Sequence, residues 1–326
     1  MRRREFMALM SGAVLARPGA ALCQIAKVHH LGTLSPSFPR DEKSPEGTTL
    51  VRALAEHGYA LGKNLTLEAR GARGQNSELP RMMEELKAAN VEVIVTIGYR
   101  AALAAKASGI SVVIASGAGD PVATGLVDSL ARPGGNVTGI SDDAAAMSRK
   151  RLSLLKHLLP NMRSVAMIWN RDDLGMSLRY EASAKAAEVL GVKVQALGVR
   201  EPDDFDGVFE AMDRDRPDAI LMVSDVLTVL NRKRVIDYAA AKRIPAIYEE
   251  QQFARDGGLM SYGADRGEMF ERAGDFVAQI FNGKRPADIP FEQPTRFPFV
   301  INLKTARAIG LEVPPTLAAL ADEVIE

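Results

Sequence analysis

The sequence has little cysteine and no excess of either charge. Cys23 is the only cysteine among 326 residues, which excludes an internal disulfide framework and a metal site built from several thiolates. Lysine plus arginine and aspartate plus glutamate number 41 each, so there is no surplus positive charge for a nucleic-acid backbone or an anionic membrane. Because 47% of the residues are apolar, the chain can bury one large core or two of ordinary domain size. These features favour a globular protein with a small-molecule partner and no nucleic acid.

The sequence also lacks the common catalytic arrangements. Of its four histidines, His29 and His30 are neighbours on a predicted strand, where they point to opposite faces and cannot share a metal ion. There is no Gly-x-Ser-x-Gly elbow and no His-Glu-x-x-His pair. The adjacent acids Asp172-Asp173 and Glu249-Glu250 are interpreted as solvated loop residues rather than as an acid and base pair. We therefore expect neither enzymatic activity nor a bound metal.

Three glycine-containing stretches fail as nucleotide-binding loops. "GYALGKN", residues 58–64, has one residue too few between its glycines and an asparagine where a hydroxyl residue would hold magnesium. Gly117-Ala118-Gly119 lacks the third glycine of the dinucleotide fingerprint, and Pro121 interrupts the helix start. Pro133-Gly134-Gly135-Asn136 has the composition of a turn, and residues 137–140 then resume as a strand. We expect no cofactor.

An export signal is predicted at residues 1–23, where three arginines precede an apolar run and then small residues and a proline. The run is about half as long as the roughly 20 residues of a spanning helix. Arg3-Arg4-Glu5-Phe6-Met7 resembles the twin-arginine pattern. Leu22 stands where a lipid-attachment signal has a small residue, which disfavours a lipid anchor on Cys23. We expect a soluble mature protein in the periplasm.

From residue 27 onward, short β-branched runs alternate with stretches of helical period, which is typical of an α/β protein with parallel sheets. Several runs are apolar throughout, as strands covered on both faces should be. In the helical stretches, apolar residues recur at i, i+3, i+4 and i+7, for example in 79–86 and 205–212, and we interpret them as core. The predicted strands are residues 27–34, 65–69, 92–97, 111–115, 164–169, 193–197, 219–223 and 258–262.

Polar residues follow most of these strands. Ligands of doubly wound sheets bind outside the carboxyl ends of the strands, so these residues are the binding candidates. The turn at residues 129–141 separates two series of strand and helix, and we expect the candidates to line a cleft between two lobes. They are Ser35, Gly98, Tyr99, Arg100, Ser116, Asp120, Asn170, Ser224, Asp225 and Tyr248.

Several longer stretches resemble the solute-binding proteins of ABC importers, in the subfamily that includes tryptophan and other aromatic amino-acid binders. They are "GYALGKNLTLEAR", "VEVIVTIG", "GDPVATGLVDSLARPGGNVTGIS", "IPAIYEEQQFARDGGLMSYGAD" and "GKRPADIPFEQPTRFPFVINLKTARAIGLEVPPTLAALADEVIE". These stretches are spread over almost all of the chain after the predicted signal. The segments 131–136 and 300–306 are the most specific of them.

The resemblance implies a type I periplasmic-binding fold, with two doubly wound lobes joined by three crossings that close over one solute. It places residues 24–140 and about 265–292 in lobe 1, and residues 141–264 and about 293–326 in lobe 2. It further implies a monomer whose partners are a small-molecule solute, an ABC permease and its ATPase subunit. A periplasmic sensor module with the same clamp is the alternative, and an enzyme such as a dehydrogenase or sugar-processing protein is a third hypothesis.

For the solute we expect an amino acid or another aromatic or carboxylate compound. Amides at the helix start at Gly98 would bind its carboxylate, because helix starts favour anions. Asp120 or Asp225 would bind its amine, since a buried amine requires a partner acid. Arg100 would offer two parallel donors to the carboxylate, and Tyr99 would stack on a ring or close the pocket. The Tyr99-Arg100 pair departs from relatives, which commonly have a small hydroxyl residue and then a neutral one, so the resemblance does not fix the solute.

Overall fold

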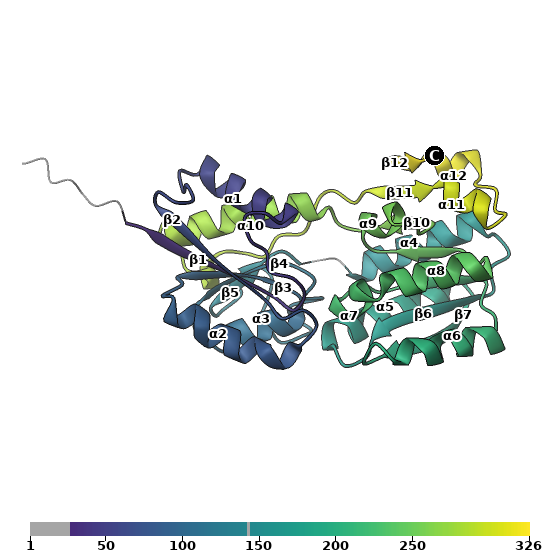
Figure 1. Ribbon diagram of the computed structural model, residues 1–326, viewed down its shortest axis with the longest axis horizontal. Coiled ribbons are helices and arrows are strands. Elements are labelled where there is room, and N and C mark those ends of the chain that lie inside the picture. The colour runs from purple at the N-terminus through teal and green to yellow at the C-terminus, as the bar shows by residue number, and fades with distance from the viewer. Residues whose placement is uncertain (1–26, 142–143) are drawn as a thin grey trace, which may run out of the picture.

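The protein consists of two α/β lobes that lie side by side (Figure 1). The computed structural model describes residues 27–141 and 144–326, and the export signal predicted at residues 1–23 lies outside them. Each lobe has one β-sheet with helices packed on both faces. This arrangement confirms the predicted α/β class with two doubly wound lobes.

The first lobe is built on a five-stranded parallel sheet with the order β2-β1-β3-β4-β5. Helices α1 and α10 cover one face, and α2 and α3 cover the other. The strands are β1 (His29–Ser35), β2 (Leu65–Gly71), β3 (Val93–Ile97), β4 (Ser111–Ser116) and β5 (Val137–Gly139). The helices are α1 (Pro45–Glu56), α2 (Leu79–Ala88), α3 (Tyr99–Lys106) and α10 (Arg266–Phe281), with short 3-10 turns η1 (Asn76–Glu78) and η2 (Pro286–Asp288).

The second lobe has a seven-stranded sheet with the order β12-β11-β10-β9-β8-β6-β7. Its strands are β6 (Ser164–Asn170), β7 (Lys193–Val199), β8 (Ala219–Met222), β9 (Ala246–Tyr248), β10 (Met260–Tyr262), β11 (Phe299–Asn302) and β12 (Glu323–Ile325). Its helices are α4 (Ala144–Leu158), α5 (Leu174–Val189), α6 (Asp204–Arg214), α7 (Val226–Leu230), α8 (Arg232–Lys242), α9 (Gln251–Arg255), α11 (Leu303–Ala308) and α12 (Pro315–Ala318).

One pair in the second sheet is antiparallel, whereas its other pairs are parallel, as predicted. Strands β10 and β11 pair in opposite directions. The chain leaves this lobe at the end of β10 and returns to it at the start of β11, so the two strands run toward and away from the same end of the lobe. The strands β9, β11 and β12, of three or four residues each, were not predicted because such short runs carry no clear period.

Both sheets are buried on both faces, as the apolar strand sequences require. In β3, Val93 and Val95 face the core under α1 and α10, whereas Ile94 faces the core under α2 and α3. In β6, Met167 faces the core under α4 and α5, whereas Ile168 faces the core under α6 and α8. The apolar helix stripes predicted at residues 79–86 and 205–212 lie in these cores, which confirms their interpretation.

The glycine-rich turn before β5 holds no phosphate-binding helix. Gly134 takes a φ of 85°, and Asn136 donates from Nδ2 to the carbonyl oxygens of Lys106 at 3.1 Å and Ile110 at 2.7 Å. These bonds tie the turn to the loop between α3 and β4, and β5 then completes the sheet. The turn interpretation is confirmed.

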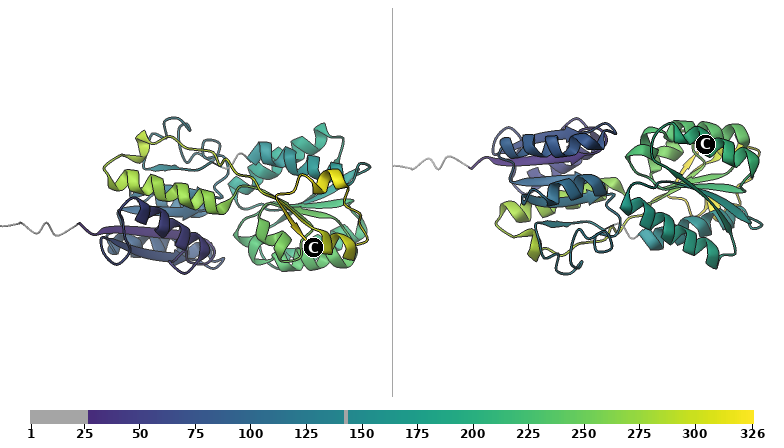
Figure 2. Two further views of the ribbon diagram at one scale, coloured as in Figure 1. Left: turned by 90° about the horizontal axis from the view of Figure 1, so that it is seen from above. Right: turned by 90° about the horizontal axis from the view of Figure 1, so that it is seen from below.

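The chain passes between the lobes three times: after residue 141, at residues 263–265 and at residues 292–298 (Figure 1). These crossings are hydrogen-bonded to one another: Ser141 N–H donates to the Glu292 carbonyl at 2.8 Å, and Asp265 N–H donates to the Arg296 carbonyl at 3.0 Å. After the second crossing, α10 packs beside α1, where Gly274 lies so near Ala53 that a Cβ on it would be 2.6 Å from the Ala53 Cβ. Figure 2 shows α10 beside the N-terminal elements.

Candidate functional site

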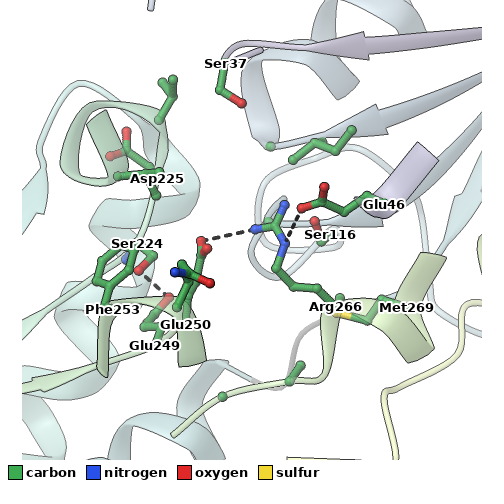
Figure 3. Close-up of a pocket in the computed structure, with 18 of the residues that line it drawn as sticks. Ser37, Glu46, Ser116, Ser224, Asp225, Glu249, Glu250, Phe253, Arg266 and Met269 are labelled. Atoms are coloured by element: carbon green, nitrogen blue, oxygen red, sulfur yellow. Dashed lines mark hydrogen bonds and ion pairs between the residues drawn. The ribbon is translucent and has the colours of Figure 1, made fainter. Parts of the chain in front are cut away.

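A cavity of about 520 Å³ lies between the lobes at the carboxyl ends of the strands (Figure 3). In lobe 1 it is lined by residues that follow β1, β3 and β4, and in lobe 2 by residues that follow β6, β8 and β9. Each sheet order reverses here, between β1 and β3 and between β6 and β8, and doubly wound folds bind ligands at such points. Its polar lining includes Ser37, Gly98, Ser116, Asp173, Asp225 and Glu250.

The lobe 1 wall contains the N-terminus of α3. Gly98 takes a φ of 81°, which favours glycine, and its N–H donates to the Ser116 carbonyl at 2.8 Å. Among the described residues, no side chain caps this helix. The buried hydroxyl of Ser116 also has no hydrogen-bond partner within the described part of the chain. The amides of the first turn and this hydroxyl together suit a carboxylate.

The lobe 2 wall contains two carboxylates, Asp225 and Asp173. Asp225 caps α7 through Thr228 N–H at 2.9 Å and accepts a bond from Asn170 Nδ2 at 2.6 Å. Asp173 caps α5 through Met176 N–H at 3.2 Å and is 6% exposed. Both side chains line the cavity, so each is fixed by a helix start and faces the space between the lobes.

The two carboxylates lie in an environment that disfavours their negative charge. Burial and the neighbouring Asp225 raise the pKa of Asp173 to about 6. Burial likewise raises the pKa of Asp225, against the hydrogen bonds that it accepts. Arg100 of lobe 1 is the nearby cation, with its Nε 4.0 Å from Asp173 Oδ2. A ligand ammonium at this wall would stabilise both ionised carboxylates.

Deeper in lobe 2, Glu249 lies between two buried arginines. Its Oε1 is 2.8 Å from Arg151 Nη1, and its Oε2 is 2.7 Å from Arg179 Nη1. The Ser224 N–H also donates to Oε2, at 3.2 Å. Arg151 in turn donates from Nε to the Tyr262 carbonyl at 2.7 Å, so the cluster joins α4, α5, β8, β9 and β10. It fixes the floor of the cavity.

A second ion-pair group spans the two lobes beside the hinge. Arg266, at the start of α10, lies 3.2 Å from Glu46 of lobe 1 and 3.1 Å from Glu250 of lobe 2 (Figure 3). Arg40 lies 3.8 Å from Glu46. This group contains two arginines and two glutamates, so it carries no net charge of its own.

Six of the predicted site residues line the cavity: Gly98, Tyr99, Arg100, Ser116, Ser224 and Asp225. The side chain of Arg100 points across the cavity to lobe 2, where it donates to the Asp172 carbonyl. The position predicted to hold the carboxylate therefore bridges the lobes instead. Likewise, the N–H of Gly98 is engaged with Ser116, so the amides available to an anion belong to the residues after it.

Ser35 and Tyr248 lie outside the cavity lining. Ser35 is the last residue of β1, fully buried, with its hydroxyl 3.0 Å from that of Ser37, and Ser37 is the one that reaches the cavity. Tyr248 is the last residue of β9, not the residue after it, and its ring packs at 5.5 Å from Phe253 in the lobe 2 core. The predicted contact of Tyr248 with a ligand is wrong, because the alternation of the strand points its ring into the core.

Asp120 and Asn170 lie outside the lining as well. Asp120 is exposed, and its Oδ1 accepts from the N–H groups of Val122 and Ala123 at 2.9 and 3.1 Å, so it caps a surface turn. Of the two acids offered as amine partners, Asp225 alone faces the cavity. Asn170 lies behind Asp225 and donates a hydrogen bond to its carboxylate.

Sequence reasoning missed four residues of the cavity lining: Asp173, Glu249, Arg151 and Arg179. The interpretation of the two acid pairs as solvated loop residues is wrong for Asp173 and Glu249, which are 6% and 7% exposed. A signal for Arg179 was present. It lies on the same face of α5 as the buried Met176 and Ser183, three and four residues away, and a charge on a buried helix face requires a partner.

The family model of ABC transporter substrate binding proteins matches residues 43–325. The chain belongs to this family. ABC substrate-binding proteins bind small molecules and work with ABC transporters, so a solute and a transporter are the expected partners. Among residues 27–141 and 144–326, no helix combines the length and apolarity needed to cross a membrane.

Relatives of known structure or function agree with this assignment. The chain is 25% identical over 275 residues to the tyrosine-binding protein of Clostridioides difficile, covering 84% of this chain and 78% of that protein. A Streptococcus pneumoniae ABC domain in complex with L-Trp superposes with a TM-score of 0.83 at 24% identity, over 92% of this chain and 100% of that one. The ligand-free, open structure of a substrate binding protein with adhesive properties from Clostridium difficile superposes with a TM-score of 0.66 at 22% identity. The match covers 92% of this chain and 99% of that one.

Proposed function

We propose that this protein binds an α-amino acid in the cleft between its lobes and delivers it to the permease of an ABC importer. The observation that carries the proposal is the opposition of two walls. Lobe 1 presents the uncapped α3 start with the Ser116 hydroxyl, and lobe 2 presents Asp225 and Asp173. An α-amino acid carries a carboxylate and an ammonium on one carbon, which complements these walls.

The rest of the cavity supports a neutral side chain. The arginines near the hinge are paired with glutamates, and the lining includes the apolar residues Met176, Val229 and Phe253. Relatives that bind L-tryptophan and tyrosine support an aromatic amino acid. The higher TM-score to the L-Trp complex than to the open, ligand-free structure supports a closed arrangement of the lobes.

The family match favours transport over a sensor role, because its description is that of a transporter component. In this proposal the protein works outside the cytoplasm after cleavage of the signal predicted at residues 1–23, as a monomer. It changes no covalent bond of its solute. The ATP that drives import is hydrolysed by a separate ATPase subunit.

A thermal-shift screen with the twenty amino acids, aromatic acids and small carboxylates tests the proposal. A ligand at 100 times its dissociation constant stabilises a protein by about 2.7 kcal/mol. We expect L-tryptophan or L-tyrosine to raise the melting temperature, and their desamino analogues to raise it much less. A screen in which no amino acid shifts the melt would contradict the proposal.

The variant Asp225→Asn tests the amine partner, because asparagine keeps the helix cap while it removes the charge. Titration calorimetry should show affinity for the amino acid reduced at least tenfold. Asp203→Asn is the matched control. Asp203 is exposed and occupies the N-cap position of α6, where its side chain makes no capping hydrogen bond among the described residues. Equal affinities of the two variants would exclude Asp225 as the amine partner.

A further inference from the structure

The lobes touch outside the hinge at two glycines. Gly119 follows β4 in lobe 1, and Gly175 lies in the first turn of α5 in lobe 2. A Cβ on Gly119 would lie 3.0 Å from the Gly175 Cα, and a Cβ on Gly175 would lie 3.0 Å from the Ala118 carbonyl oxygen. Both distances are shorter than ordinary van der Waals contacts, so backbone approaches backbone closely here, and a side chain at either position requires the lobes to shift by a few tenths of an ångström.

Gly175 is not required by its own backbone conformation. It lies within a helix, whereas Gly119 takes a φ of 72°. Glycine is less favourable than alanine inside a helix, so a glycine at this position needs another reason. The close approach of lobe 1 supplies that reason.

An ionic contact lies beside the glycine pair. Arg100, in the first turn of α3, donates to the Asp172 carbonyl and has its Nε 4.0 Å from Asp173 Oδ2. Asp173 caps α5, the helix that carries Gly175. The polar contact and the backbone contact therefore meet lobe 2 on one short segment, residues 172–175.

Asp173 also belongs to the cavity wall. Asp173 lines the cavity together with Asp225, the N-cap residue of α7. Arg100 is the charged residue of lobe 1 that reaches Asp173. A cation bound between the two carboxylates favours the ionised form of Asp173, and the ionised form pairs better with Arg100. The cavity and the contact between the lobes thus share one carboxylate, that of Asp173.

We propose that Gly119, Gly175, Arg100 and Asp173 form a latch that holds the lobes together before any solute binds, and that Asp173 links this latch to the cation site of the cleft. The contact of the lobes needs no ligand atom. Its link to a solute rests on the function proposed above. Closure then follows a pre-existing equilibrium that an ammonium ligand shifts further.

Small-angle X-ray scattering of the ligand-free protein tests the latch directly. Gly175→Ala and Gly175→Leu insert side chains of increasing size between the lobes. Alanine and leucine are both good helix formers, so α5 should be retained. Gly207→Ala and Gly207→Leu are matched controls, because Gly207 is also helical and nothing lies within 4 Å of a Cβ placed on it. Thermal melts verify that every variant is folded.

We expect the radius of gyration to increase in the order wild type, Gly175→Ala, Gly175→Leu, with both Gly207 variants equal to wild type. Arg100→Gln should give an increase by a different route, since its side chain adds no bulk. Radii that are unchanged in the Gly175 variants and in Arg100→Gln would overturn the proposal.

Titration with L-tryptophan and L-tyrosine provides the second arm. If either one binds the wild type, Gly175→Leu should weaken that binding at least tenfold and Gly207→Leu should not. Equal affinities of Gly175→Leu and Gly207→Leu would overturn the link between latch and cleft. If no amino acid binds, the proposed function fails, and the scattering of the ligand-free variants still decides the latch.

Discussion

The Nδ2 of Asn170 donates a 2.6 Å hydrogen bond to Oδ2 of Asp225. Asn170 ends β6 and Asp225 follows β8, so the bond joins the two strands at which the lobe 2 sheet reverses its order. Asn170 does not reach the cavity itself. It holds the carboxylate that does, so we propose that it is a positioning residue for the ammonium site.

Asn170→Ala should weaken amino-acid binding roughly tenfold, because a hydrogen bond to a charged group contributes about 1.5 kcal/mol or more. The measurement is calorimetric titration with L-tryptophan and with its desamino analogue, indole-3-propionate. The analogue has no ammonium, so Asn170→Ala and the wild type should bind it with similar affinity. A parallel loss for both compounds would mean that Asn170 supports the fold and not the cation site.

Amino-acid affinity should fall as the pH drops below about 6. Burial and Asp225 raise the pKa of Asp173 to about 6, so below that pH the carboxyl binds a proton in the ligand-free protein. A bound ammonium favours the ionised carboxylate and must displace this proton, which costs up to about tenfold in affinity per pH unit. Asp225, whose pKa burial also raises, adds to the effect in the same direction, and Arg100 opposes it.

Titrations at pH about 5 and about 7.5, in buffers of different ionisation enthalpy, measure both the affinity and the protons released on binding. Proton release should be seen at the lower pH and should be smaller in Asp173→Asn, where Asp225 still contributes. An affinity that is the same at both values, with no proton release, would contradict the placement of an ammonium group between these carboxylates.

Ser116→Ala should reduce affinity for the amino acid by roughly tenfold, because its hydroxyl would otherwise donate to the ligand carboxylate. Ser261→Ala is the matched control. Ser261 is also a buried serine whose hydroxyl has no partner among the described residues, and it lies in β10 outside the cavity lining. If both variants bind as the wild type does, the carboxylate site at α3 is wrongly placed.

Glu249→Gln should destabilise the protein by about 3 to 5 kcal/mol, because breaking a buried ion pair leaves buried charge without compensation. Arg151 and Arg179 both contact this carboxylate and are 4% and 7% exposed. Thermal and urea melts without ligand measure the effect. Glu181→Gln, at an exposed position on α5, should leave the melts unchanged. A Glu249→Gln melt equal to that control would show that the cluster adds little stability.

The α/β class could be predicted from the sequence because local periods specify its elements, whereas the assignment of the lobes came from the family resemblance. Strands such as 219–222 are apolar throughout, and helices such as 205–212 repeat at i, i+3, i+4 and i+7, so each element indicates which face is buried. The short strands β9, β11 and β12 were missed because three or four residues carry no period. Their pairing depends on contacts between segments that lie far apart in the chain.

The candidate site could be predicted only in part, since the rule that polar residues follow strands says nothing of which way a side chain points. It placed Ser116 and Asp225 correctly at the cavity, whereas Asp120 caps a surface turn and Tyr248 enters the core. Arg266 reaches the cleft from the start of α10, beyond the residues that directly follow the predicted strand 258–262. Such residues come together only when the lobes do.

A crystal structure of the protein with L-tryptophan would show whether the two walls of the cleft hold the two charged groups of one amino acid. We expect the ammonium within hydrogen-bond distance of the Asp225 carboxylate and the carboxylate at the start of α3, beside the Ser116 hydroxyl. An empty cleft at saturating ligand, or a ligand with its ammonium directed at α3, would contradict it.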